Sequence, residues 1–384
     1  MTESSNDTAM TFRAGHVGDV GWRAAVEEVL RQVQPLPTGA NLGFVYISDR
    51  LVQAMDSVLQ YLKQATGISE WVGSVGVGVL ANGAEYFDQP ALVIMVAALP
   101  PGEFKVFSGR SPAPTPGTKT PSGAEAAHFA VIHGDPHTGD LPLLIEDMSA
   151  KLASGYLVGG ISSSRSTLCQ IAGEVLVGGL SGVVLSSRID VATRHTQGCV
   201  PLRHAPGQSV MQHIVTEADR NIIATLDGRP ALDVLCAEIG EPLARDLERA
   251  ANYVHVGLPI PGSDTGDYLV RNVIGYDPDG GRVAIGDYVE PGTSIFFCWR
   301  DGNAARDDLR RMLEEIGRDL ERPPRAGLYF SCLGRGEQMF GAPSAELAII
   351  RDRLGDFPLA GFFCNGEIAH DKLYTYTGVL TLFR

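Results

Sequence analysis

Hydrophobic residues follow two patterns along this chain, short continuous runs and positions at helical spacing. The continuous runs 42–47, 91–99 and 128–133 predict buried strands, because a strand buried on both faces shows no polar alternation. Apolar residues at helical spacing in 51–62 and 141–152 predict amphipathic helices between them. The chain is therefore predicted to be α/β, or more broadly α+β, with mixed sheets flanked by helices.

The same order of elements occurs twice in the first half of the chain. A strand, a helix and a glycine-rich strand follow one another in 42–79 and again in 128–161, and a further apolar strand follows each set. Residues 71–79 are expected to form one glycine-rich strand. Residue identity between the two copies is poor, so the order of elements alone suggests an internal duplication.

A length of 384 residues favours two domains. We expect a flexible N-terminal tail and lead helix in 1–38, a first domain in 39–228 and a second in 229–384. Residues 1–20 are expected to be loose. The stretch 100–127 is rich in Pro, Gly, Ser and Thr, which predicts a surface insertion with little structure of its own.

The charge and the apolar runs limit the partners and the compartment. A formal net charge of −14 disfavours nucleic acids and anionic membrane surfaces as partners. The polar N-terminus has no signal-peptide core, and 91–99 is too short to cross a bilayer. The six scattered cysteines form no C-x-x-C pair, which is typical of reduced thiols. We expect a cytoplasmic protein.

Common cofactor and catalytic motifs are missing from the sequence. The pair Gly76-Val-Gly78 lacks the third glycine of a dinucleotide site, and no Walker A lysine follows a glycine run. Neither H-E-x-x-H nor G-x-S-x-G occurs, and the cysteines and histidines lack the spacing of metal ligands. We therefore predict neither a cofactor nor a metal site.

Two polar, glycine-containing turns near the end of the chain stand out. Cys332-Leu-Gly-Arg-Gly336 and Cys364-Asn-Gly-Glu367 each follow an apolar strand, and an amphipathic helix joins them. Such a unit places both strand ends at the same edge of a sheet, where open α/β sheets hold ligands. Arg335, Asn365 and Glu367 are expected to gather around one crevice.

Single residues of this region allow more than one role. Glu367 pairs with Arg335, accepts a ligand amine, or acts as a general acid or base. The charge of Arg335 would lower the pKa of the Cys332 thiol, although a buried structural thiol is the commoner case. A hydrolase or transferase that uses Cys332 or Glu367 is therefore one alternative. The polar run 162–165 forms an ordinary loop or binds an anion.

Three segments resemble the signatures of FIST domain proteins, namely Asp227-Gly-Arg-Pro-Ala231, Leu328-Tyr-Phe-Ser-Cys-Leu-Gly-Arg-Gly336 and Leu359-Ala-Gly-Phe-Phe-Cys-Asn-Gly-Glu-Ile368. The strand that ends in Leu157-Val-Gly-Gly-Ile-Ser-Ser163 is similar to part of the N-terminal domain of that family. The similarity spans roughly 39–384, as a FIST N half followed by a FIST C half.

The resemblance implies a sensory module in signal transduction, without an output domain of its own, that binds a small ligand such as an amino acid or a related metabolite. An adaptor module that binds a signalling protein is the alternative, and the oligomeric state stays open. The expected ligand contacts lie on the strand ends and turns described above: Cys332, Gly334, Arg335, Gly336, Asn365, Gly366, Glu367, Gly160, Ser162 and Ser163.

Overall fold

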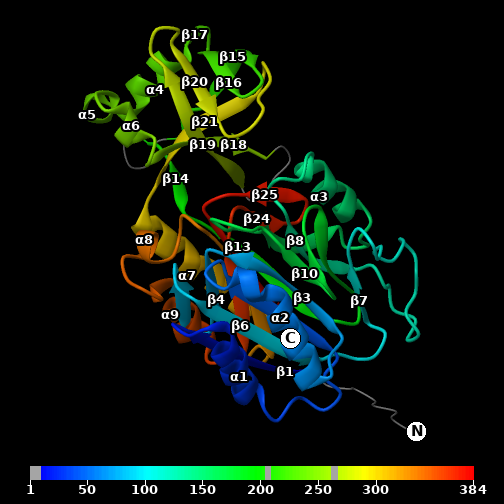
Figure 1. Ribbon diagram of the computed structural model, residues 1–384. Helices are drawn as coiled ribbons and strands as arrows, with labels where there is room; N and C mark the ends of the chain where they lie inside the picture. Colours follow the sequence, from blue (N-terminus) through cyan, green and yellow to red (C-terminus); the bar gives the residue numbers. More distant parts are fainter. Residues whose placement is uncertain (1–9, 204–208, 261–266) are drawn as a thin grey trace. The chain divides into compact units, whose positions relative to one another are not determined.

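The computed structural model describes residues 10–203, 209–260 and 267–384 (Figure 1). The contacts divide the chain into two compact units. The larger unit comprises the described part of Met1–Thr196 together with Arg306–Leu373 and Thr377–Arg384, and the smaller comprises Gln197–Ala305 and Tyr374–Tyr376. Mixed and antiparallel sheets with covering helices confirm the predicted α+β class.

Each of three sheets in the larger unit is built around one repeat of strand, helix, strand and strand. The first repeat is β2 (Leu42–Ser48), α2 (Met55–Thr66), β3 (Glu70–Gly76) and β6 (Ala91–Ala98). The second is β8 (Phe129–Gly134), α3 (Leu141–Ala150), β9 (Tyr156–Ile161) and β12 (Leu180–Leu185). The third is β22 (Ala326–Cys332), α9 (Ala345–Leu354), β23 (Leu359–Cys364) and β26 (Thr377–Phe383). In every repeat the first two strands are parallel, and the last is antiparallel to the first.

The remaining elements of the larger unit extend or cover these sheets. The added strands are β1 (Thr11–Gly18), β4 (Gly78–Ala81), β5 (Ala84–Phe87), β7 (Phe104–Phe107), β10 (Gln170–Ala172), β11 (Val175–Leu176), β13 (Val191–Gln197), β24 (Glu367–Ala369) and β25 (Lys372–Tyr374). The added helices are α1 (Trp22–Val33), the 3-10 turn η1 (Val52–Ala54), α7 (Gly302–Arg318) and α8 (Glu337–Phe340). Helices α1 and α2 bury their apolar faces on the first sheet, and α3 buries its face on the second.

The parallel strands of each repeat approach each other at a glycine. The opposed residues are Gly73 with Val45, Gly159 with Ile132, and Gly361 with Tyr329. A Cβ on these glycines would lie 1.7, 1.8 and 1.7 Å from the carbonyl oxygen of the opposed residue. A side chain is sterically excluded at this position, so the same constraint appears once in each repeat.

The next residue of each first strand points to a common centre. The rings of Tyr46 and His133 lie 5.6 Å apart between centroids, and each lies 6.2 Å from the ring of Phe330. All three contacts are edge-on, with interplanar angles of 61°, 79° and 74°. Equivalent residues of three repeats thus form a nearly equilateral triangle, which marks a pseudo-threefold axis through the core.

Each repeat passes one strand to the sheet of another repeat. Strand β4 continues from β3 and pairs with β23, β24 continues from β23 and pairs with β9, and β10 follows β9 and pairs with β3. This exchange closes a cycle among the three sheets. The two copies suggested by the sequence are therefore two members of a threefold arrangement, whose third member is formed by 326–383.

Three local predictions need correction. Residues 11–18, expected to be a loose tail, form β1, because they supply the outer partner that β6 requires along its whole length. The single strand expected in 71–79 divides at Val77, because its two parts belong to different sheets. The insertion 100–127 contains β7, which pairs with β12. Residues 1–9 lie outside the described residues.

The smaller unit is a separate closed structure. Its strands are β14 (Cys199–Pro201), β15 (His213–Asp219), β16 (Ile222–Leu226), β17 (Arg229–Pro230), β18 (Val254–Pro259), β19 (Tyr268–Asp277), β20 (Arg282–Ile285) and β21 (Ser294–Arg300). Its helices are α4 (Ala231–Ile239), α5 (Glu241–Ala244) and α6 (Leu247–Ala250). The antiparallel order β15-β16-β20-β19-β18-β21 returns to β15, so the sheet closes into a ring around an apolar core. Strands β15 and β16 form one antiparallel hairpin, and β19 and β20 form another. No helix among the described residues has the length and apolarity needed to cross a membrane.

Candidate functional site

The three connections that pass strands between sheets surround one cavity of about 780 Å3 in the larger unit. Val77 joins β3 to β4, Asn365 and Gly366 join β23 to β24, and residues 162–169 join β9 to β10. Side chains from all three connections line the cavity. The site therefore lies at the carboxyl ends of the parallel strands, where α/β folds commonly bind ligands.

The second connection breaks the symmetry of the repeats. It contains eight residues, 162–169, whereas the first contains Val77 alone and the third contains Asn365 and Gly366. The additional length carries Ser164, Arg165, Ser166 and Leu168, all of which line the cavity. The departure from threefold symmetry is thus concentrated at the wall of the cavity.

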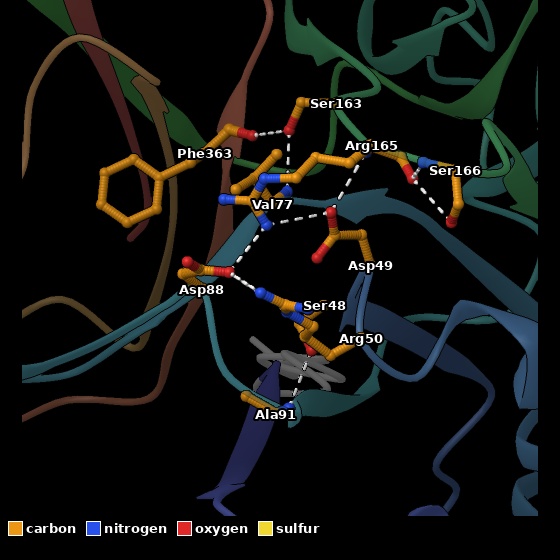
Figure 2. A network of polar contacts seen from close by, with 11 residues as sticks. Ser48, Asp49, Arg50, Val77, Asp88, Ala91, Ser163, Arg165, Ser166 and Phe363 are labelled. Carbon is orange, nitrogen blue, oxygen red and sulfur yellow. Dashed lines mark hydrogen bonds and ion pairs between the residues drawn. The ribbon is translucent and has the colours of Figure 1, made fainter.

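One serine of the second connection bonds residues of the other two repeats. The Ser163 hydroxyl accepts a hydrogen bond from the main-chain N–H of Val77 at 2.9 Å and donates to the carbonyl oxygen of Phe363 at 2.5 Å (Figure 2). Its own main-chain N–H donates to the carbonyl oxygen of Val75 at 3.3 Å. These bonds fix the floor of the cavity relative to all three sheets.

Arg165 is held in place by two carboxylates outside the cavity. Its Nη1 lies 2.8 Å from Asp88 Oδ1 and 3.3 Å from Asp49 Oδ2, and its main-chain N–H also donates to Asp49 Oδ2 at 3.1 Å (Figure 2). Arg50 bonds the same oxygen of Asp88 through Nε at 3.1 Å and Nη2 at 2.5 Å. The Asp49 side chain is only 4% exposed, whereas that of Arg165 is 47% exposed. The guanidinium is therefore both anchored and open to solvent.

The lining of the cavity combines apolar and polar side chains. Val77, Phe87, Leu168 and Leu333 form apolar wall, and the polar groups are hydroxyls, amides, an imidazole and one guanidinium. No aspartate or glutamate is among the residues that line it. A cavity of this size, with an apolar wall and a few convergent polar groups, has the properties of a small-molecule site.

Comparison with known proteins assigns the family. The FIST N domain matches residues 41–229 and the FIST C domain matches residues 231–370. The chain belongs to the FIST family. FIST domains are sensory domains in signal transduction. The boundary between the two FIST matches lies inside the smaller compact unit, whereas the larger unit contains residues of both matches.

Mycobacterial proteins are similar along nearly the whole chain. The uncharacterized protein Rv0628c of Mycobacterium tuberculosis is 34% identical over 379 residues, which cover 94% of this chain and 96% of the relative. The uncharacterized protein Mb0898c of Mycobacterium bovis is 31% identical over 353 residues, which cover 88% of this chain and 87% of the relative. In both cases the alignment covers most of the present chain and most of the relative.

The structure places three residues of the FIST site predicted from the sequence in the wall of the cavity. These are Ser162, Ser163 and Asn365. Ser162 is fully buried and its hydroxyl lies 2.8 Å from that of Ser74, whereas the side chain of Asn365 is exposed. The structure thus brings together predicted residues from the second and third repeats.

Arg335 lies behind this wall, in a buried cluster. It is 1% exposed, and its Nη2 and Nε lie 2.6 and 2.8 Å from Oε1 of Glu346 on α9. Glu346 also accepts hydrogen bonds from the hydroxyls of Tyr329 and Ser331. Arg335 does not line the cavity, because Glu346 on α9 supplies a buried counter-ion.

The other predicted residues of the closing turns lie in the same interior. Glu367 is fully buried, burial raises its pKa well above the ordinary value, and hydrogen bonds from Thr377 and Cys332 oppose that shift. Gly160 pairs with Glu367, and a Cβ on Gly160 would lie 2.1 Å from the Cys364 sulfur. Of the remaining turn glycines, Gly336 and Gly366 are buried and Gly334 is half-buried, and none of the three lines the cavity. The crevice expected for Arg335, Asn365 and Glu367 together therefore contains only Asn365 of the three.

Sequence reasoning missed much of the wall of this FIST cavity. Val77 lay inside a predicted strand. Asp49 and Asp88, which anchor Arg165 without lining the cavity, come from segments with no motif. Arg165 was recognised only as part of a polar run that forms a loop or binds an anion. The sequence contained one signal for the longer second connection. In each repeat a crowded glycine lies in the second strand, and the number of residues between that glycine and the next strand is largest after Gly159.

Proposed function

We propose that this FIST protein is a sensory module that binds a small ligand in the cavity where the three repeats meet. The observation that supports this proposal is the cavity itself, because all three repeats contribute to its wall. Its volume of about 780 Å3 is within the range of ligand pockets, roughly 300–1,000 Å3. An amino acid or a related metabolite is of suitable size.

The proposed contacts are the residues that line the cavity at the strand ends. Ser162, Ser163 and Asn365 stay in this proposal, and Arg165 joins them because of its exposed guanidinium. The buried cluster around Arg335 and Glu367 would support the wall from behind. A ligand that touches all three connections would stabilise one arrangement of the repeats. A partner protein that binds this arrangement would then receive the signal.

Thermal unfolding with a panel of amino acids and related metabolites tests the proposal. The Leu168→Trp variant fills the cavity, whereas Leu143→Trp places the same side chain on an exposed position of α3. We expect a ligand to raise the melting temperature of the wild type and of Leu143→Trp but not of Leu168→Trp. Equal protection of all three proteins, or no protection by any compound, would contradict the proposal.

A protein-binding role is the second candidate, and the smaller unit favours it. Among the described residues, Ile274 and Tyr288 of this unit are 61% and 76% exposed. Large exposed apolar side chains are enriched at protein interfaces. If the unit is an adaptor, Ile274→Lys with Tyr288→Lys should abolish co-purification of a partner from the host, while the melting temperature stays unchanged. The enzyme alternative receives no support from the cavity, because neither Cys332 nor Glu367 lines it.

A further inference from the structure

Arg165 uses only one edge of its guanidinium to hold its place. Both side-chain bonds to the described residues involve Nη1, which contacts Asp49 and Asp88. Nε and Nη2 make no hydrogen bond to any other described side chain or main-chain group. These two nitrogens form the edge of a guanidinium that binds two oxygens of a carboxylate in parallel. The anchored side chain thus presents an unused, planar pair of donors.

The lining of the cavity contains a single cationic donor group. Arg165 is the only lysine or arginine among the residues that line the cavity, and together with Arg50 it balances Asp49 and Asp88. Its free edge therefore offers two charge-assisted donors to one carboxylate group, and the lining has no second cation for a dianion. Asp49 and Asp88 contact Nη1, and neither is part of the lining. Because the lining contains no carboxylate, a ligand ammonium group would find no counter-ion among the lining residues.

The remainder of the lining suits an apolar body. Leu168, Leu333 and Phe87 come from three different segments, and all three line the cavity. Burial of an apolar chain or ring against them gains roughly 25 cal/mol per Å2 of apolar area removed from water. The cavity thus combines one fixed donor edge with an apolar wall.

We propose that the ligand is a small organic acid, and that Nε and Nη2 of Arg165 bind its carboxylate in a bidentate manner. The inference rests on the proposed function, since it names the class of ligand for the same cavity. It narrows the expectation of an amino acid, because the lining would bind the carboxylate and the apolar body but contains no carboxylate to pair with the ammonium group. The longer second connection is the element that adds this recognition to the threefold fold.

Calorimetric titration with matched compounds tests the inference. The probes are isocaproate and phenylpropionate, each compared with its amide, with leucine or phenylalanine, and with an alkyl phosphate of the same length. We expect one of the acids to bind, and its amide, amino acid and phosphate counterparts to bind about tenfold or more weakly. Equal or tighter binding of the amide, the amino acid or the phosphate would overturn the inference.

Variants of two arginines locate the recognised group. Arg165→Gln should weaken binding of the acid about ten- to hundredfold, because a charge-assisted bidentate pair is lost. Arg165→Lys keeps the charge that Asp49 and Asp88 require but lacks the second donor, so it should fold and still bind the acid about tenfold more weakly. Arg310→Gln removes an exposed cation of α7 that pairs with Asp307 and is not part of the lining, and it should bind the acid as the wild type does. Wild-type affinity in Arg165→Lys and Arg165→Gln would overturn the inference.

The two proposals fail in different ways. If amides or amino acids bind the wild type and Leu168→Trp abolishes that binding, the cavity is a ligand site and only the carboxylate inference is wrong. If no compound of any class binds in a manner that Leu168→Trp abolishes, the proposed function is wrong and the inference falls with it.

Discussion

The hydroxyl of Ser163 donates to the carbonyl oxygen of Phe363 at 2.5 Å and accepts from the N–H of Val77, so one side chain joins all three repeats. Ser163→Ala would leave two buried main-chain groups without this partner. Each such loss costs about 1–3 kcal/mol, so we expect a clearly lower free energy of unfolding in urea. Ser166→Ala, at an exposed position of the same connection, should change it by less than about 0.5 kcal/mol. Identical unfolding of the two variants would contradict this role.

The crowded glycines should tolerate no side chain. In Gly361→Ala the new Cβ would lie 1.7 Å from the carbonyl oxygen of Tyr329, so β22 and β23 would have to separate. We expect loss of soluble folded protein or a decrease in melting temperature of well over ten degrees, measured by circular dichroism, because separation breaks the parallel pair. Gly317→Ala in α7 is the matched control, since the nearest atom to its new Cβ would be in the Leu354 side chain at 3.8 Å, and it should gain about 0.5–1 kcal/mol. A stable Gly361→Ala protein would show that the strands are not so close.

Much of the fold could be predicted from the sequence because its strands are buried on both faces. The runs 42–47 and 128–133 were found for this reason, and the unit 326–368 was also recognised as strand, helix and strand. The threefold relation was not predicted from the sequence, because the equivalent core positions carry Tyr46, His133 and Phe330, which differ in chemistry. The division at Val77 was also missed, since a strand that changes sheets keeps the same composition along its length.

The sequence analysis placed the candidate site at the strand ends, where the structure has a cavity, but several of the side chains that it named do not line that cavity. Asn365 and Ser163 were named because each follows the end of a predicted strand, and both line the cavity. The direction of the Arg335 side chain depends on Glu346, which a helix brings back to the turn. No local pattern shows that contact. The position of Arg165 likewise depends on Asp49 and Asp88, which are distant in the sequence.

The Arg335–Glu346 pair gives a prediction that separates support from ligand contact. Both side chains are fully buried, so Arg335→Leu would leave an uncompensated buried carboxylate. We expect a loss of about 3–5 kcal/mol in the free energy of unfolding, measured in urea at neutral pH. The double variant Arg335→Leu with Glu346→Leu should recover part of that loss. Arg310→Ala, which breaks an exposed pair with Asp307, should cost less than about 1 kcal/mol. A double variant less stable than the single one would contradict this account.

His133 should make the larger unit sensitive to acid. Burial lowers its pKa from 6.5 to about 3, so between these values the unfolded chain binds a proton that the folded protein does not. Stability contributed by the neutral imidazole is therefore complete above about pH 6.5 and decreases as the pH falls towards 3, by about 1.4 kcal/mol per unit. His133→Phe, which copies Phe330 at the equivalent position, should lose less stability than the wild type between pH 6.5 and 4 in urea titrations.

The control for this prediction keeps the imidazole and removes its neighbour's hydroxyl. Tyr46→Phe loses the contact of 3.3 Å to His133 Nε2 but should keep the acid sensitivity of the wild type. His255 of the smaller unit has its pKa lowered to about 4 by burial, and it is present in all three proteins. Only the difference between His133→Phe and the other two therefore reports on His133. If the free energy of unfolding falls equally with pH in the wild type, Tyr46→Phe and His133→Phe, the prediction is contradicted.

Glu85 should act in the opposite direction. It is 8% exposed, its Oε1 accepts the N–H of Glu337 at 3.1 Å, and burial raises its pKa from 4.5 to about 7. Between these values the folded protein binds a proton that the unfolded chain does not, so stability is lost as the pH rises from about 4.5 to 7. Glu85→Gln keeps the shape of the neutral acid. It should resemble the wild type at pH 5 and exceed it in unfolding midpoint at pH 8, whereas the exposed Glu27→Gln should show no such pH-dependent gain. A Glu85→Gln midpoint below that of the wild type at pH 8 would show that the ionised carboxylate stabilises the fold.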